Sequence, residues 1–108
     1  MSPRKSNKLV RDRIPEIIKQ SGRTPIVETL SGLELKDALN AKLIEEVEEF
    51  LNAPDDNKAV EELADIFEVI SALATWHNFS EDELLTFAQN KRKYRGGFTR
   101  GLYYRGDT

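Results

Sequence analysis

Apolar side chains recur at intervals of three and four in four stretches of the chain, the spacing that places them on one face of an α-helix. The stretches predict helices over residues 13–21, 33–52, 56–76 and 81–95. Residues 24–30 alternate only weakly and are expected to form a loop or a short extended piece. We therefore expect an all-α fold in which four helices form a bundle.

Capping residues set the expected helix boundaries. Asp12 can accept a free amide at the start of the first helix. Ser31 with Glu34, and Ser80 with Glu83, have the spacing of a capping box, in which the Ser side chain accepts a backbone N–H and the Glu reaches back. The second and fourth helices are therefore expected to begin just after Ser31 and Ser80.

The second predicted helix carries carboxylates on its apolar face. Each residue turns about 100° around a helix axis, so Glu46 falls between Leu39 and Phe50 on the apolar stripe. Glu49 lies at the margin of that stripe, whereas Glu48 points to the opposite side. A carboxylate that faces a core is unfavourable unless it is paired or binds a metal, so Glu46 and Glu49 are candidate ligands.

The third predicted helix repeats this arrangement, with Glu62 and Asp65 inside its wide apolar arc. Residues 53–56 (Ala-Pro-Asp-Asp) break the helical pattern and should fold the two helices into an antiparallel hairpin. Residues equidistant from the turn of a hairpin lie at similar heights, which pairs Glu49 with Glu62 and Glu46 with Asp65. The sequence therefore predicts that four carboxylates converge.

A cluster of carboxylates alone suits a hard cation such as Mg²⁺, with Mn²⁺ as an alternative. Zinc would usually take nitrogen and sulfur ligands, and the chain has no cysteine. A di-iron site in a helix bundle would add histidines in Glu-x-x-His spacing. The single histidine, His77, is not three residues after a Glu, and we expect it to end the third helix rather than bind metal.

Charge is distributed unevenly along the chain, whose net charge is −3. Residues 26–85 carry three Lys against sixteen acids, a net of −13, whereas residues 1–25 (seven basic, two acidic) and 86–108 (six basic, one acidic) are each +5. This pattern indicates either a solvated helical surface with basic tails or a cation-binding centre fringed by groups that hold a polyanion. The candidate phosphate contacts are Lys91, Arg95, Lys8 and Arg11.

The sequence also excludes several classes of protein. Its basic start is not followed by an apolar run, and no stretch reaches the roughly 18 apolar residues of a spanning helix. We expect a single cytoplasmic domain over 1–108, with a basic N-terminal helix and connector in 1–30 and a tail in 96–108. Since neither a P-loop nor a Ser/His/Asp arrangement is present, metal-assisted attack by water is the remaining phosphate chemistry.

Several motifs resemble those of a known superfamily. The pattern K-x-x-E-E-x-x-E at 42–49, followed by E-x-x-D at 62–65, resembles the E-x-x-E…E-x-x-D signature of the all-α NTP pyrophosphohydrolases. That superfamily includes MazG-like enzymes, phosphoribosyl-ATP pyrophosphohydrolase and the dimeric dUTPases. The stretch A-Q-N-K…R ending at Arg95 is similar to the family's A-N-x-K…R, with Gln in place of Asn. The opening NKLVRDRIPEII and the closing RGGF look like a small branch of predicted house-cleaning pyrophosphatases, so the resemblance extends over nearly the whole chain.

The resemblance implies an Mg²⁺-dependent enzyme that hydrolyses a nucleoside triphosphate to a monophosphate and pyrophosphate. The implied metal ligands are Glu46, Glu49, Glu62 and Asp65. Lys91 and Arg95 would contact the phosphates, and Lys8 and Arg11 are weaker candidates for the same role. Glu45 lies about 40° from Glu49 on the helical wheel, so it is either a candidate for orienting the attacking water or an ordinary surface charge. A homodimer or higher oligomer is expected, because the apolar arc of the third helix is wider than one hairpin partner can cover.

Two other functions stay open at this point. A non-catalytic helical module could bind another protein through its apolar faces. A nucleic-acid binder could use the basic ends and the aromatic residues near the C-terminus for stacking, although the acidic centre argues against it. The preferred base and sugar of a nucleotide substrate cannot be read from the sequence.

Overall fold

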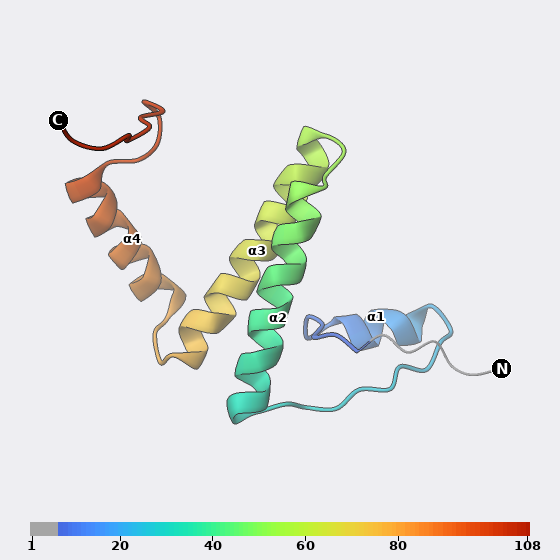
Figure 1. Ribbon diagram of the computed structural model, residues 1–108. Helices are drawn as coiled ribbons and strands as arrows, with labels where there is room; N and C mark the ends of the chain where they lie inside the picture. The colour runs from blue at the N-terminus through green and yellow to red at the C-terminus, as the bar shows by residue number, and fades with distance from the viewer. Residues whose placement is uncertain (1–6) are drawn as a thin grey trace.

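The computed structural model describes residues 7–108, which form four α-helices joined by irregular segments (Figure 1). The helices are α1 (Ile14–Gln20), α2 (Gly32–Leu51), α3 (Asp56–Trp76) and α4 (Glu81–Arg95). No strand occurs in this part of the chain. The all-α prediction is therefore confirmed, and each boundary lies within one residue of its predicted position.

Two of the helix starts are capped by side chains. The Asp55 carboxylate accepts the backbone N–H of Lys58 at 2.8 Å and begins α3. At α4 the predicted capping box is present: Ser80 Oγ accepts the Glu83 N–H, and the Glu83 carboxylate accepts the Ser80 N–H, both at 3.1 Å. These local bonds define the two ends of the segment that links α3 to α4.

The other two predicted caps were wrong. α1 begins after Arg13 rather than Asp12, and no side chain caps its amides. Ser31 does precede α2, but its side chain makes no capping bond, so the box with Glu34 does not form. The Pro15 ring in the first turn of α1 removes one amide that would need a partner.

α2 and α3 form an antiparallel hairpin that holds the small core (Figure 1). Within residues 7–108 only four side chains are buried, namely Leu39, Val69, Glu46 and Glu62. At the open end of the hairpin the Trp76 indole N–H donates to the Gly32 carbonyl at 3.0 Å. The Lys36 ammonium lies 5.2 Å from the centre of the same ring, a cation–π distance that ties α2 to α3.

α4 diverges from the hairpin. It contacts α3 near the connecting segment and then runs away from it, so that in the described chain it makes no helix–helix contact with α2 (Figure 1). α1 and the segment that follows it lie on the other side of the hairpin. Four helices are present as predicted, but within one chain they do not close into a bundle.

The single chain is extended and exposes much apolar surface. Its Cα radius of gyration is 18.2 Å, whereas a compact domain of this length would have about 13 Å. Its accessible surface is 9994 Å², against about 6,100 Å² for a compact protein of this mass. The most exposed large apolar side chains near the C-terminus are Tyr94, Phe98, Leu102, Tyr103 and Tyr104. None of the helices described is long and apolar enough to cross a membrane.

Candidate functional site

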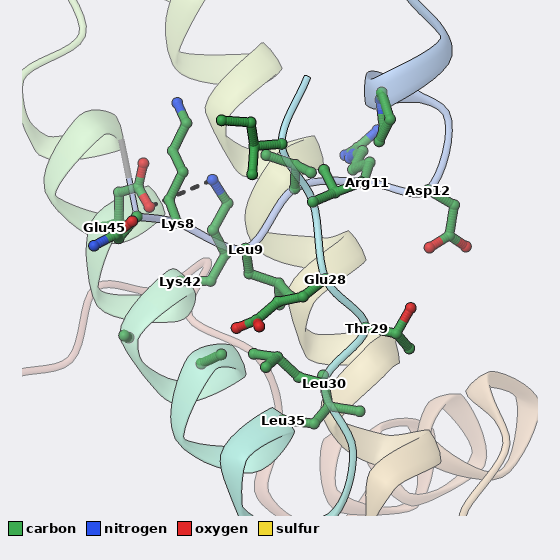
Figure 2. Close-up of a pocket in the computed structure, with 17 residues that line it drawn as sticks. Lys8, Leu9, Arg11, Asp12, Glu28, Thr29, Leu30, Leu35, Lys42 and Glu45 are labelled. Atoms are coloured by element: carbon green, nitrogen blue, oxygen red, sulfur yellow. Dashed lines mark hydrogen bonds and ion pairs between the residues drawn. The ribbon is translucent and has the colours of Figure 1, made fainter. Parts of the chain in front are cut away.

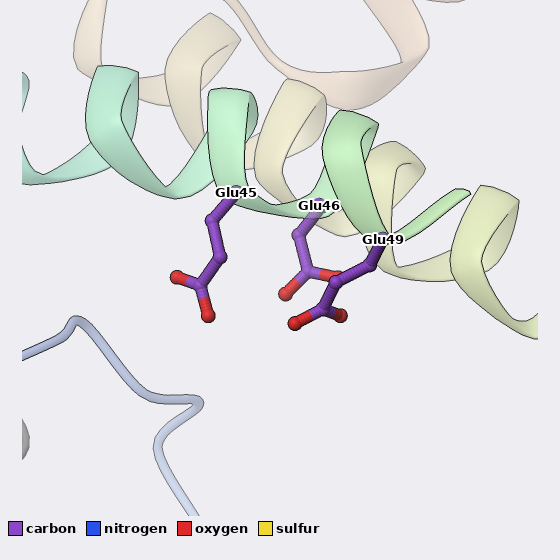
Figure 3. A group of neighbouring side chains, drawn as sticks. All are labelled: Glu45, Glu46 and Glu49. Atoms are coloured by element: carbon purple, nitrogen blue, oxygen red, sulfur yellow. The ribbon is translucent and has the colours of Figure 1, made fainter. Parts of the chain in front are cut away.

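Three carboxylates project from one side of α2 (Figure 3). Glu45, Glu46 and Glu49 each offer an oxygen, and these oxygens lie within 4.8 Å of one another. The three and four residue spacings place them one turn apart on the helix. The wheel prediction for Glu46 and Glu49 therefore agrees with the geometry, and Glu45 lies beside them.

α3 brings two more acids to Glu46. Oxygens of Glu46, Glu62 and Asp65 also lie within 4.8 Å of one another. Glu46 thus belongs to both groups and joins the acids of the two helices across the hairpin. The predicted register, in which residues equidistant from the turn meet, is the register of the structure.

Burial separates the inner acids from the outer ones. Glu46 and Glu62 are only 5% and 4% exposed. Glu48, on the other side of α2, is exposed, and the Glu61 side chain is 68% exposed. Asp65 is only partly buried and Glu49 is exposed at the margin. Helical position therefore decided which carboxylates enter the core.

Within residues 7–108, each buried glutamate has one lysine partner. Lys42 Nζ lies 3.1 Å from Glu46 Oε1 and 3.4 Å from Glu45 Oε2. Lys58 Nζ lies 3.4 Å from Glu62 Oε1. The second oxygen, Oε2, of both Glu46 and Glu62 is buried without a hydrogen-bond partner among the described residues. A buried charged oxygen without a partner is unfavourable, and a bound cation would satisfy both atoms.

The acids also influence the protonation of their neighbours. Partial desolvation, a hydrogen bond to Glu62 and the charge of Glu46 raise the pKa of Glu49 above its ordinary value. Burial by itself lowers the pKa of Lys42, but its hydrogen bond to Glu46 and the charge of Glu45 outweigh burial and raise that pKa. The cluster therefore holds more negative charge than its lysines neutralise, which favours a divalent cation.

The basic N-terminal segment reaches this cluster. Arg11 Nη2 donates to Asp65 Oδ1 at 2.9 Å, across 54 positions of sequence. Lys8 lies in the same segment and is exposed. Lys91 and Arg95 are exposed on the diverging helix α4 and form no ion pair with the acids of their own chain among the described residues. The structure thus brings Arg11 into contact with the acids, places Lys8 in the same segment and leaves the C-terminal candidates apart.

A cavity of about 700 Å³ lies next to the cluster (Figure 2). Residues 7–12, residues 26–30 and the first half of α2 form its walls, and Lys42 and Glu45 close the end that faces the acids. No pattern in the sequence predicted this cavity, because two irregular segments with weak patterns form most of it. The short side chains Ala38 and Ala41, one turn apart on α2, were the available sequence signal.

The donor set is compatible with a magnesium site. All the candidate ligand atoms are carboxylate oxygens from α2 and α3, which is the chemistry that hard divalent cations prefer. His77 packs edge-on against Trp76, with ring centroids 4.9 Å apart, and belongs to neither acidic group. The acidic cluster can hold a cation beside the basic N-terminal segment and the open cavity.

Comparison with known proteins shows a similarity over part of the chain. An uncharacterised protein of Mycolicibacterium smegmatis (strain ATCC 700084 / mc(2)155) is 57% identical over 53 residues, which are 49% of this chain and 54% of that protein. The chain therefore spans about half the length of the curated relative that it matches. No family model matches the chain, and no solved structure matches it.

Proposed function

We propose that the protein is a metal-dependent pyrophosphohydrolase that converts a nucleoside triphosphate and water into a nucleoside monophosphate and pyrophosphate. The observation that carries the proposal is the pair of buried oxygens of Glu46 and Glu62, without a hydrogen-bond partner among residues 7–108, at the centre of a carboxylate cluster. Core positions normally hold apolar side chains. Two helices that both place a carboxylate there support a role in binding a cation.

The residues that would hold Mg²⁺ are Glu46, Glu49, Glu62 and Asp65. The bound ion would polarise the phosphate and make water a better nucleophile at neutral pH. Glu45 lies at the edge of the cluster, where its carboxylate can orient a water and accept a proton from it. Lys42 neutralises part of the negative charge through its contacts with Glu45 and Glu46.

The basic residues would hold the triphosphate. Arg11 already lies against Asp65, so its forked guanidinium is close enough to exchange that carboxylate for a phosphate oxygen. Lys8 would add a second positive charge from the same segment. Both side chains are exposed and therefore free to move towards a bound polyanion.

Lys91 and Arg95 would act on the site of a second copy of the chain. α4 makes no helix–helix contact with α2 in the part of the chain described, so these residues do not reach the acids of their own chain. The accessible surface of the chain is 9994 Å², whereas a compact protein of this mass exposes about 6,100 Å². The excess is several times the roughly 800 Å² that each partner buries in a standard interface. A homodimer would cover this surface and complete the bundle.

A pyrophosphate-release assay over a panel of nucleoside triphosphates tests the function. With Mg²⁺ we expect turnover of at least one nucleotide, none in EDTA, and none from Glu46→Gln in either condition. Glu48→Gln is the matched control, because Glu48 lies on the same helix but is exposed on the opposite side. A chain that releases no pyrophosphate from any of them, and whose thermal unfolding does not respond to Mg²⁺, would instead be a non-catalytic helical module.

A further inference from the structure

The cavity beside the acidic cluster has the form of a binding site for an organic group. Its volume of about 700 Å³ lies within the range of roughly 300–1,000 Å³ that is typical of small-molecule pockets. Leu9, Leu30 and Leu35 give it apolar walls, and Ala38 and Ala41 leave room above α2. The cavity therefore combines apolar surface with space that short side chains keep open.

The position of the cavity limits what it can hold. Lys42 and Glu45 line one end, and Lys42 also contacts the buried Glu46 at 3.1 Å. A molecule in the cavity would thus have one end at the acids, beside Lys42 and Glu45, and its body between residues 7–12 and 26–30. This arrangement matches a ligand that has a charged group at one end and, at the other, a largely apolar body carrying a few polar groups.

One carboxylate that lines the cavity, that of Glu28, is exposed and makes no polar contact with another described side chain. Glu28 lines it and points between Leu9 and Leu30 towards α2 (Figure 2). No hydrogen bond or ion pair of Glu28 with a described residue is present. Glu45, by contrast, is paired with Lys42. An ionised carboxylate only accepts hydrogen bonds, so a ligand that pairs with Glu28 in place of water has to donate them.

We propose that this cavity binds the nucleoside part of a nucleotide, with the Glu28 carboxylate accepting two adjacent hydrogen bonds from it. Two parts of a nucleoside present such a pair of donors: the 2′ and 3′ hydroxyls of ribose, and the N1–H and N2–H edge of guanine. The planar base would cover apolar surface that is now exposed at Ile26 and Val27, which are 91% and 60% exposed. This inference rests on the proposed function in one respect, namely that the triphosphate of the nucleotide lies at the acidic cluster.

The test measures binding without turnover. Uniformly ¹⁵N-labelled protein is titrated in EDTA with three neutral probes: guanosine, 2′,3′-dideoxyguanosine, which lacks both ribose hydroxyls, and adenosine, which lacks the guanine edge. We expect saturable chemical-shift changes in residues 7–12 and 26–30 and around Ala38. Loss of binding with dideoxyguanosine alone assigns Glu28 to the ribose, and loss with adenosine alone assigns it to the base.

Two variants and a control make the test specific. Glu28→Gln keeps one acceptor but loses the charge, and should weaken guanosine binding about tenfold or more. Ala38→Leu should fill the cavity and abolish binding, with circular dichroism showing that the helices persist. Glu68→Gln removes an exposed carboxylate of α3 outside the cavity and should bind as the unmodified protein does.

Several results would overturn the proposal. These are the absence of saturable shifts up to about 1 mM guanosine, shifts confined to α3 and α4, or unchanged affinity in Glu28→Gln. Shifts of residues 26–30 that depend on protein concentration without any nucleoside would make the cavity an interface between copies. Pyrophosphate release measured in parallel keeps the two ideas apart, because nucleoside binding without turnover refutes the proposed function alone.

Discussion

Replacing Glu46 with Gln should have opposite effects on stability with and without a divalent cation. In the metal-free protein, Glu46 has acidic oxygens of Glu62 and Asp65 within 4.8 Å. Each pair of like charges at that distance repels by about 3.5 kcal/mol at an effective dielectric constant of 20. Lys42, at 3.1 Å, offsets part of this repulsion. An uncharged amide at position 46 removes the repulsion and can donate to the neighbouring carboxylates.

The expected net gain is small, because Lys42 loses its better partner and keeps only Glu45 at 3.4 Å. We expect Glu46→Gln to stabilise the metal-free protein by about 1 kcal/mol, which corresponds to a rise in Tm of about 4–8 °C for a domain of this size. With Mg²⁺ at about 100 times its Kd, the unmodified protein should gain about 2.7 kcal/mol. The variant should not gain this, so the order of the two Tm values should reverse.

Thermal unfolding followed by circular dichroism, in EDTA and in a series of Mg²⁺ concentrations, measures both effects. Glu62→Gln should behave in the same way, since Glu62 is equally buried with an unpartnered oxygen. Glu48→Gln should follow the unmodified protein in both conditions. The reasoning fails if Glu46→Gln and Glu48→Gln respond equally to Mg²⁺, or if Glu46→Gln is the less stable protein in EDTA.

Four further predictions concern assembly, the role of Arg95, protonation and capping. Light scattering at micromolar concentration should give at least twice the 12.3 kDa mass of one chain. Arg95→Ala should lose turnover, whereas the control Arg100→Ala should not. If Arg95 acts on the acids of the partner chain, mixing the Arg95→Ala and Glu46→Gln proteins should restore activity, and no recovery would contradict that role. The pKa of Glu49 in the folded protein is raised above 4.5. Its contribution to the stability of the metal-free protein is therefore present below pH 4.5 and lost as pH rises through the folded-state pKa. Thermal unfolding in EDTA over a pH series should show this loss of stability, and Glu49→Gln should abolish this pH dependence. Asp55→Ala should lower the free energy of unfolding in urea by about 1 kcal/mol, because the only side-chain cap of α3 is lost.

Helix positions could be predicted from the sequence because the signals are local. The caps at Asp55 and Ser80 are bonds between residues three apart, and Pro54 marks the turn of the hairpin. The failed caps at Asp12 and Ser31 have the same residue types, but their backbone and side chains make no such bond. Capping propensity therefore indicates where a helix begins more reliably than which bond forms there.

The acidic cluster could be predicted because a helical wheel and a hairpin turn together fix its geometry. Glu46 and Glu62 are both buried, and no information beyond the sequence was needed to place them on facing stripes. The contact of Arg11 with Asp65 and the cavity at Glu28 could not be found in this way. Both depend on the path of irregular segments, in which no periodicity relates residues far apart in sequence.

The small core has a consequence for how the fold is stabilised. Two of the four buried side chains within residues 7–108 are glutamates, so the hairpin lacks the apolar burial that normally stabilises a domain of this size. Arg11 and the lysines offset part of the charge, but the buried Oε2 atoms keep no partner in the described chain. Any group that binds only the folded form, whether cation, nucleotide or second copy, therefore increases stability by mass action. A protein built in this way should be most stable when its site is occupied, which couples folding to the proposed reaction.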